Sequence, residues 1–286
     1  MTGEAFPSSS IETLRRAYPE QPVMLDHGLA GHELMEIDAL LELSRRIRPV
    51  DAEYNRGDIP VGLDPADTPA NGLSAEETIR RIGECGSWMV LKFIEQDEVY
   101  RALLHETLER IEPAVHAATG KMLKREGFIF ISSPGSVTPF HFDPEHNILL
   151  QVLGTKRMNI FPAADEEIVS GAEHERFHNG GHRNLPWQED FAQAGRAFDL
   201  TPGKGVYVPV KAPHWVKNGP EVSVSLSVTW RSEWSYREEY ARRMNHFLRN
   251  AGMDPRAPRR FPHQNHVKSL GYRVIEKAKR LSGRPS

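Results

Sequence analysis

The middle of this chain is a succession of short strand-like segments, and this pattern limits the folds that the chain can adopt. After Gly127 the apolar residues change from a helical spacing to the alternation typical of strands. The predicted strands are, in chain order, residues 128–133, 137–143, 147–153, 157–161, 197–200, 205–209, 214–217 and 222–230. Many short strands in one block predict an all-β barrel or a double-sheet jelly roll. Gly154-Thr155, between the third and fourth strands, indicates a hairpin turn.

Helices are predicted on both sides of the strands. The helical segments are 10–17, 32–47, one that starts at the capping-box pattern Ser74–Glu77, 97–119, 234–250 and 264–281, and two more strands are expected at 22–26 and 88–93. Residues 48–73 hold four Pro and three Gly, which favours a long surface loop. We therefore expect a mainly β protein in three parts: a helical and mixed flank (1–126), a β core (127–232) and C-terminal basic helices (233–286).

The composition indicates the compartment of the protein and its relation to membranes. Cys85 is the single cysteine, which excludes an internal disulfide framework and fits a reducing compartment. No apolar run approaches the roughly 20 residues that span a membrane, and the N-terminus has no basic-then-apolar signal pattern. We expect a cytoplasmic protein with no membrane contact.

The charge is unevenly distributed along the chain. From Arg231 to the end there are 14 Lys and Arg against 5 Asp and Glu, a segment charge of +9, whereas residues 1–230 carry −12. A basic segment can bind nucleic acid, which remains possible here. We favour the interpretation that these helices pack with a solvated basic face on an acidic body or on a second subunit.

The first chemically informative motif is the strand Thr138-Pro-Phe-His-Phe-Asp143. Side chains alternate across a strand, so His141 and Asp143 point to one face. One imidazole and one carboxylate are two-thirds of a 2-His-1-carboxylate triad, which holds a ferrous ion and leaves positions open for substrates. With 13 histidines in the chain, such a pair also arises by chance beside a turn.

A second motif supplies the missing ligand. The run from Gly203 to Asn218 has the spacing G-x5-P-x4-H-x3-N, in which a strand ends at Pro209 and His214 follows. The combination of His-x-Asp with this histidine resembles the cupin-like JmjC family of iron(II)/2-oxoglutarate-dependent dioxygenases, in its hydroxylase branch. The resemblance covers about residues 127–232 and implies a double-stranded β-helix core, Fe(II) held by His141, Asp143 and His214, and 2-oxoglutarate as co-substrate.

The same resemblance implies roles for four further residues. Thr138 matches the family threonine that bonds the co-substrate carboxylate, and Asn147 lies where the family often has an asparagine. Lys156 falls where the family lysine pairs with the distal carboxylate of 2-oxoglutarate. Ser227 departs from the family pattern, because a well-known relative has asparagine there, and it can equally be a pocket-lining residue.

Elementary electrostatics supports a cation beside the metal. 2-Oxoglutarate is a dianion, and a buried carboxylate without a partner is too costly to leave unpaired. Lys156 follows Gly154-Thr155, one strand beyond Asp143, so we expect its side chain to reach a carboxylate bound beside the metal. In the last strand apolar Val222–Trp230 positions alternate with Ser and Thr, and this hydroxyl face would suit either solvent or a polar lumen.

Other polar and aromatic residues carry weaker interpretations. Tyr207 and Trp215 can wall the pocket or pack in the barrel, and His146 is expected in the loop after Asp143. Residues 163–195 look like an irregular insertion, whose histidines we assign to a surface loop, with a second metal site or a substrate lid as alternatives. These histidines are His174, His178 and His182. Lys92 and Arg157 can add positive charge near the pocket.

We predict an iron(II)- and 2-oxoglutarate-dependent oxygenase that uses dioxygen and releases succinate and CO2. The substrate, a protein side chain or a small molecule, is not identified by the sequence. Hydroxylation is favoured over demethylation, and the resemblance implies a homodimer through the C-terminal helices. The alternatives are a cupin-type ligand-binding or regulatory protein with a non-catalytic metal site, and a zinc cupin isomerase. The intact triad with Thr138 and Lys156 argues against the first alternative, and the small number of protein ligands argues against the second.

Overall fold

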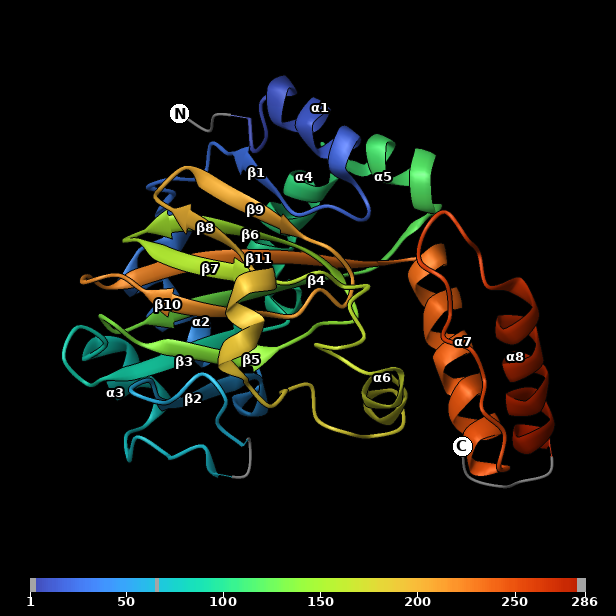
Figure 1. Ribbon diagram of the computed structural model, residues 1–286. Helices are drawn as coiled ribbons and strands as arrows, with labels where there is room; N and C mark the ends of the chain where they lie inside the picture. Colours follow the sequence, from blue (N-terminus) through green and yellow to red (C-terminus); the bar gives the residue numbers. More distant parts are fainter. Residues whose placement is uncertain (1–3, 65–66, 282–286) are drawn as a thin grey trace.

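Two antiparallel β-sheets form the body of the protein in a computed structural model that describes residues 4–64 and 67–281 (Figure 1). The large sheet has the order β1 (Val23–Asp26), β9 (Lys204–Val208), β6 (His146–Leu153), β11 (Ser223–Ser232), β4 (Met122–Ser132), β3 (Ser87–Lys92) and β2 (Ala52–Arg56). The small sheet has the order β5 (Val137–His141), β10 (His214–Asn218), β7 (Lys156–Ile160) and β8 (Arg196–Leu200). The predicted mainly β, jelly-roll architecture with helical flanks is confirmed.

The strands of the core cross repeatedly between the two sheets. β4, β6, β9 and β11 belong to the large sheet, whereas β5, β7, β8 and β10 belong to the small one. Gly154-Thr155 therefore connects β6 to β7 across the sheets, and the prediction of a hairpin there is wrong. Gly154 has φ +65, and a Cβ atom on it would lie 2.2 Å from the carbonyl oxygen of Val222, so this crossing requires glycine.

The N-terminal segment contributes strands as well as helices. β1 pairs with β9 at one edge of the large sheet, and β3 and β2 extend the other edge beyond β4. The prediction that residues 48–73 are a loop is wrong for 52–56, which form β2 after the short 3-10 helix η2 (Pro49–Asp51). Residues 65–66 of that prediction lie outside the described residues.

The predicted helices are present in the predicted order, but one of them is divided in two, and a further helix at 171–177 lies in the segment 163–195 that was predicted to be irregular. The helices are α1 (Ser8–Ala17), α2 (Ile37–Arg46), α3 (Ala75–Arg80), α4 (Glu98–Glu109), α5 (Glu112–Thr119), α6 (Gly171–Phe177), α7 (Glu233–Asn250) and α8 (His266–Leu281). The single helix predicted over 97–119 is divided into α4 and α5, because Pro113 lies in the first turn of α5 and has no N–H to continue a helix. The capping box at Ser74 and Glu77 is formed as predicted.

The main hydrophobic core lies between the large sheet and the N-terminal helices. Strand β11 contributes Val224, Leu226, Val228 and Trp230 to this core. The alternate residues Ser225, Ser227 and Thr229 face the space between the two sheets, where they are also buried. The hydroxyl face predicted for this strand therefore lines a polar interior, and the alternative of a solvent-facing edge is wrong.

The C-terminal helices α7 and α8 pack side by side at one end of the double sheet (Figure 1). A buried ion pair joins α7 to the turn that precedes β10, with 2.7 Å between Lys211 Nζ and Glu238 Oε2. Arg242 Nε donates to the other carboxylate oxygen of Glu238. The backbone N–H of Lys211 donates to the carbonyl of Asp143 at 2.8 Å, so this residue contacts both the helix and the barrel. In the described part of the chain no helix is long and apolar enough to cross a membrane.

Candidate metal and co-substrate site

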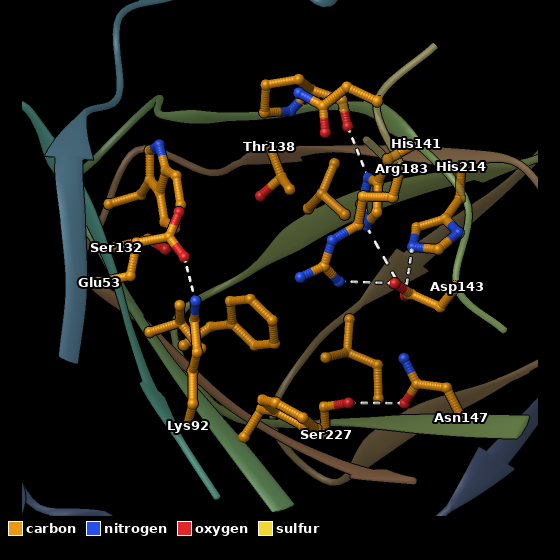
Figure 2. A pocket seen from close by; sticks show the side chains of 18 of the residues that line it. Glu53, Lys92, Ser132, Thr138, His141, Asp143, Asn147, Arg183, His214 and Ser227 are labelled. Atoms are coloured by element: carbon orange, nitrogen blue, oxygen red, sulfur yellow. Dashed lines mark hydrogen bonds and ion pairs between the residues drawn. The ribbon is translucent and has the colours of Figure 1, made fainter. Parts of the chain in front are cut away.

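A cavity of about 490 Å³ opens between the two sheets, at the end where their facing residues are polar. Its wall is built from strands of both sheets and from the segment 182–184. The predicted site residues that line it are Thr138, His141, Asp143, Asn147, Lys156, His214 and Ser227. All seven residues therefore share one cavity, although they come from five different strands and a loop. Figure 2 labels six of them, all except Lys156.

His141, Asp143 and His214 converge because β5 and β10 are paired. His141 ends β5, His214 begins β10, and the two residues lie opposite each other in the antiparallel register. Asp143 Oδ2 is 3.7 Å from His141 Nε2 and 3.6 Å from His214 Nε2. One ligand atom from each residue falls within 4.8 Å of the others, a spacing that can hold a metal ion. Strand pairing thus preorganises the two histidines, and Asp143 follows two residues after the end of β5.

The hydrogen bonds of the two histidines leave the inward nitrogen available. His141 Nδ1 lies 2.7 Å from the carbonyl oxygen of Pro139, and His214 Nδ1 lies 2.9 Å from that of Ala212. A carbonyl only accepts, so each Nδ1 carries the proton and donates it. Each Nε2 then keeps a free lone pair directed at Asp143, which is the arrangement of a metal-ligating histidine.

The protonation states of the two histidines and Asp143 also suit the binding of a metal cation. Burial, with a smaller contribution from His214, lowers the pKa of His141 to about 3. Burial lowers the pKa of His214 as well. Burial would raise the pKa of Asp143, but His141, Arg183 and the other nearby charges hold it well below its usual range. At neutral pH the site therefore presents two neutral imidazoles and one carboxylate.

Lys156 places an ammonium group inside the same cavity. It is the first residue of β7, is 5% exposed, and donates from Nζ to Ser225 Oγ at 2.8 Å. Its contact in the described chain is this hydroxyl and not a carboxylate, and burial lowers its pKa to about 7. A buried cation that has only a hydroxyl partner is unfavourable by itself, so the position suits an anionic ligand.

Three further polar groups surround the space between Lys156 and the triad. Ser227 Oγ donates to Asn147 Oδ1 at 2.7 Å, which orients the amide and leaves its nitrogen as a donor beside the cavity. Figure 2 shows the hydroxyl of Thr138 turned into the cavity from the other sheet. The cavity thus offers the Lys156 ammonium, an amide and hydroxyls next to three side chains whose spacing could hold a metal ion.

Arg183 is a site residue that the sequence analysis did not identify. Its Nη1 donates to Asp143 Oδ1 at 2.8 Å (Figure 2). The residue lies in an irregular segment without a periodic pattern, and it follows His182 in a stretch interpreted only as an insertion. The sequence shows Arg183 next to His182, but it contains no pattern that relates Arg183 to Asp143, which is 40 positions away.

The model of the Cupin-like domain family matches residues 83–236, more than half of the chain. The chain belongs to the cupin-like domain family. Over 102 residues it is 29% identical to lysine-specific demethylase 8 of Xenopus tropicalis, covering 34% of this chain and 23% of that protein. Over 106 residues it is 30% identical to lysine-specific demethylase JMJ30 of Arabidopsis thaliana, covering 35% and 24%. The matched stretch spans about a quarter of the length of these relatives.

A solved structure supports the fold of this cupin-like protein. The crystal structure of Escherichia coli ycfD superposes with a TM-score of 0.53 at 18% sequence identity, covering 95% of this chain and 68% of that one. At this identity the likeness concerns the fold alone. It extends well beyond residues 127–232, over which the resemblance was first inferred.

The cavity of the cupin-like core also has a wall from the N-terminal strands. Trp88 and Lys92 of β3 and Glu53 and Asn55 of β2 line it. Lys92 forms an ion pair with Glu53, so its charge is already neutralised. Arg157 is exposed and paired with Asp199 outside the cavity, so the interpretation that it adds charge to the pocket is wrong.

His146 is not in the loop after Asp143, as predicted, but is the first residue of β6 and fully buried. Its Nδ1 is 2.9 Å from the hydroxyl of Tyr207, and its Nε2 is 2.9 Å from that of Ser232. Its ring stacks on Trp230. His146 and Tyr207 therefore belong to the packing between sheet and helices, and neither lines the cavity. Trp215 packs against Trp187 and does not line it either.

The histidines of segment 163–195 have different environments. His174 lies on α6 and His178 directly after it, and both are buried, so their assignment to a surface loop is wrong. They pack near Lys211 and Glu238. His182 is exposed and lines the cavity mouth. In the described ranges only His141, Asp143 and His214 form a group with metal-ligand spacing.

Proposed function

We propose that this cupin-like protein is an iron(II)- and 2-oxoglutarate-dependent oxygenase. The observation that carries the proposal is the cavity itself, in which three ligand-type side chains and a buried ammonium without an anionic partner face one space. A metal ion would use the triad, and a dianionic co-substrate would neutralise the lysine. A general ligand-binding cupin has no need for both features together.

The chain's own residues can be assigned roles on this basis. His141, Asp143 and His214 would hold Fe(II), and Lys156 with Thr138 would bind the distal carboxylate of 2-oxoglutarate. Asn147 and Ser227 would contact the co-substrate from the opposite sheet. The apolar walls from Phe130, Leu149 and Val216 exclude water from the inner cavity and strengthen these charge interactions. When bound, iron and 2-oxoglutarate supply the oxidising chemistry, which yields succinate, CO2 and an oxygenated substrate.

For the substrate we propose a protein side chain or a small molecule that is hydroxylated at a C–H bond. The names of the relatives as lysine-specific demethylases support a protein side chain. They also make demethylation the alternative outcome at the same site. The two reactions differ in the product, because hydroxylation adds one oxygen atom whereas demethylation removes a methyl group as formaldehyde.

The decisive experiment measures succinate. We expect protein purified without oxygen, then supplied with iron(II), 2-oxoglutarate and air, to form succinate that increases with the true substrate. An Asp143→Ala variant serves as the inactive control, because it removes the carboxylate ligand. If the wild-type protein binds manganese(II) and 2-oxoglutarate but forms no more succinate than this control with any substrate offered, a non-catalytic ligand-binding cupin becomes the better assignment.

We also propose that the protein forms a homodimer through α8. Val267, Leu270 and Val274 form an apolar stripe at spacings of three and four residues, and each is more than half exposed. This spacing suits packing against another helix. A second copy of the chain fits best, because the C-terminal segment carries +9 and residues 1–230 carry −12, so two copies offer complementary charge.

Replacing Leu270 and Val274 together with glutamate is expected to convert the dimer into a monomer, because two charges would be buried in an apolar contact. The molar mass from light scattering after gel filtration measures this. Val50→Glu is the control, since Val50 is also an exposed apolar residue but lies on a different part of the surface, and its replacement should leave the mass unchanged. A monomeric wild-type protein at micromolar concentration would contradict the proposal.

A further inference from the structure

The two carboxylate oxygens of Asp143 have different partners. Oδ2 faces Nε2 of both His141 and His214, at 3.7 and 3.6 Å. Oδ1 points the other way and accepts a hydrogen bond from Arg183 Nη1 at 2.8 Å. Figure 2 shows the guanidinium of Arg183 beside Asp143, extending over the cavity. The charge-assisted bond therefore occupies one oxygen and leaves the other for an ion.

Arg183 is held in this place by the strand that carries His141 and by the residues that directly follow it. Residues 183–185 run against β5, where the N–H of Phe142 donates to the carbonyl of Arg183 and the N–H of Leu185 donates to that of Phe140. An isolated β-bridge pairs Asn184 with His141. The buried side chain of Leu185 packs with Phe140. Arg183 thus lies in a backbone register fixed relative to the metal-ligating strand, although its segment is irregular in sequence.

We infer that Arg183 is a positioning residue, which binds one oxygen of Asp143 so that the carboxylate can offer a metal ion only the other. This inference rests on the proposed metal site. An unrestrained carboxylate can bind a cation through both oxygens. In the proposed oxygenase that would take a position which the co-substrate would need, because 2-oxoglutarate would use two positions and dioxygen a third. Arg183 would in this way keep the site open.

Loss of Arg183 should affect metal binding and 2-oxoglutarate binding differently, whereas loss of a residue needed only for folding would weaken both. Without Arg183 the triad keeps all three ligands and loses a nearby positive charge, so metal binding should persist. The number of oxygens bound to the metal should rise, and 2-oxoglutarate should bind less tightly. Loss of an outer partner of a metal ligand typically costs about 10- to 100-fold in affinity or activity.

The test compares Arg183→Met with Arg183→Lys in the full-length protein loaded with cobalt(II), whose visible absorption reports the coordination number. We expect Arg183→Met to bind cobalt within about tenfold of the wild type, but with a changed absorption spectrum and about 10- to 100-fold weaker binding of 2-oxoglutarate. Arg183→Lys keeps a positive charge and a donor group and should recover part of both properties. Arg157→Met is the matched control, because Arg157 also pairs with an aspartate but lies outside the cavity.

Two results would overturn the inference. One is a spectrum and a 2-oxoglutarate affinity in Arg183→Met that equal those of the wild type. The other is an Arg183→Lys variant that differs from the wild type as much as Arg183→Met does. If the wild-type protein binds neither cobalt(II) nor 2-oxoglutarate, the proposed function fails and this inference with it. The wild-type titration alone distinguishes that case from a failure specific to Arg183.

Discussion

Replacing Lys156 with methionine is expected to abolish the stabilisation of the protein by 2-oxoglutarate while leaving metal binding intact. The ammonium is the only cation in the described chain that lies buried in the cavity without a carboxylate partner, and methionine replaces its apolar stem without the charge. Removing one partner of a buried charge pair costs about 2–5 kcal/mol, which corresponds to a loss of at least about 30-fold in affinity. The melting temperature with manganese(II), with and without 2-oxoglutarate, measures the effect.

Lys92→Met is the matched control for this experiment. Lys92 lines the same cavity but is already paired with Glu53, so its loss should leave the 2-oxoglutarate shift in place. If both variants keep the shift, Lys156 does not bind the co-substrate. If both lose it, the cavity wall as a whole is responsible and the specific role of Lys156 is wrong.

The pH dependence of the same binding reaction provides a second readout. Burial lowers the pKa of Lys156 to about 7, from an ordinary value of 10.5. Only the protonated amine attracts a carboxylate, so above about pH 7 a proton must be taken up when 2-oxoglutarate binds. The affinity of the wild type should therefore fall by about tenfold per pH unit above that value. Lys156→Met should lack this dependence, and an equal slope in both proteins would contradict the assignment.

Replacing His214 with alanine is expected to remove metal binding and succinate formation together. The substitution deletes one of three ligands from a site that β5 and β10 hold in register. Because loss of an outer-shell partner alone can cost 10- to 100-fold, loss of a ligand should weaken manganese(II) binding by at least about 100-fold. Titration calorimetry measures the affinity, and circular dichroism verifies that the double sheet is retained.

His182→Ala is the control for His214→Ala. Both histidines line the cavity, but His182 lies at its mouth and is not part of the triad. Its replacement should leave manganese(II) affinity unchanged. Wild-type affinity in His214→Ala, or an equal loss in both variants, would mean that the metal does not bind where we place it.

The parts of the site that the sequence predicts are those with a fixed spacing. His141 and Asp143 are two residues apart on a strand, and His214 follows a strand that ends at proline, so each position could be assigned from local pattern and family resemblance. The alternation of β11 likewise predicted one hydroxylated face. It could not reveal which side that face covers, because the answer depends on the second sheet.

The errors arise where a property depends on contacts between distant segments. Alternation identifies β6 and β7 as strands, but it does not state which sheet each one joins, so the crossing at Gly154 was taken for a hairpin. His146 follows the loop-like Asp143-Pro144, and only its contacts with Tyr207 and Ser232 show it to be an interior residue. Arg183 reaches Asp143 through a backbone bridge to β5, and an irregular segment carries no periodic signal for such a contact.

Lys211 connects helix α7 to the candidate metal site, although α7 does not line the cavity. The residue lies three positions before His214, its N–H holds the carbonyl of Asp143, and its buried amine is neutralised by Glu238. A shorter protein that stopped at the end of β11 would keep every strand of the described residues. It would, however, leave the buried amine of Lys211 without a carboxylate partner, next to the turn that precedes His214. Breaking such a buried pair costs about 3–5 kcal/mol. The turn that precedes His214 is therefore stabilised by a helix that lies outside the two sheets.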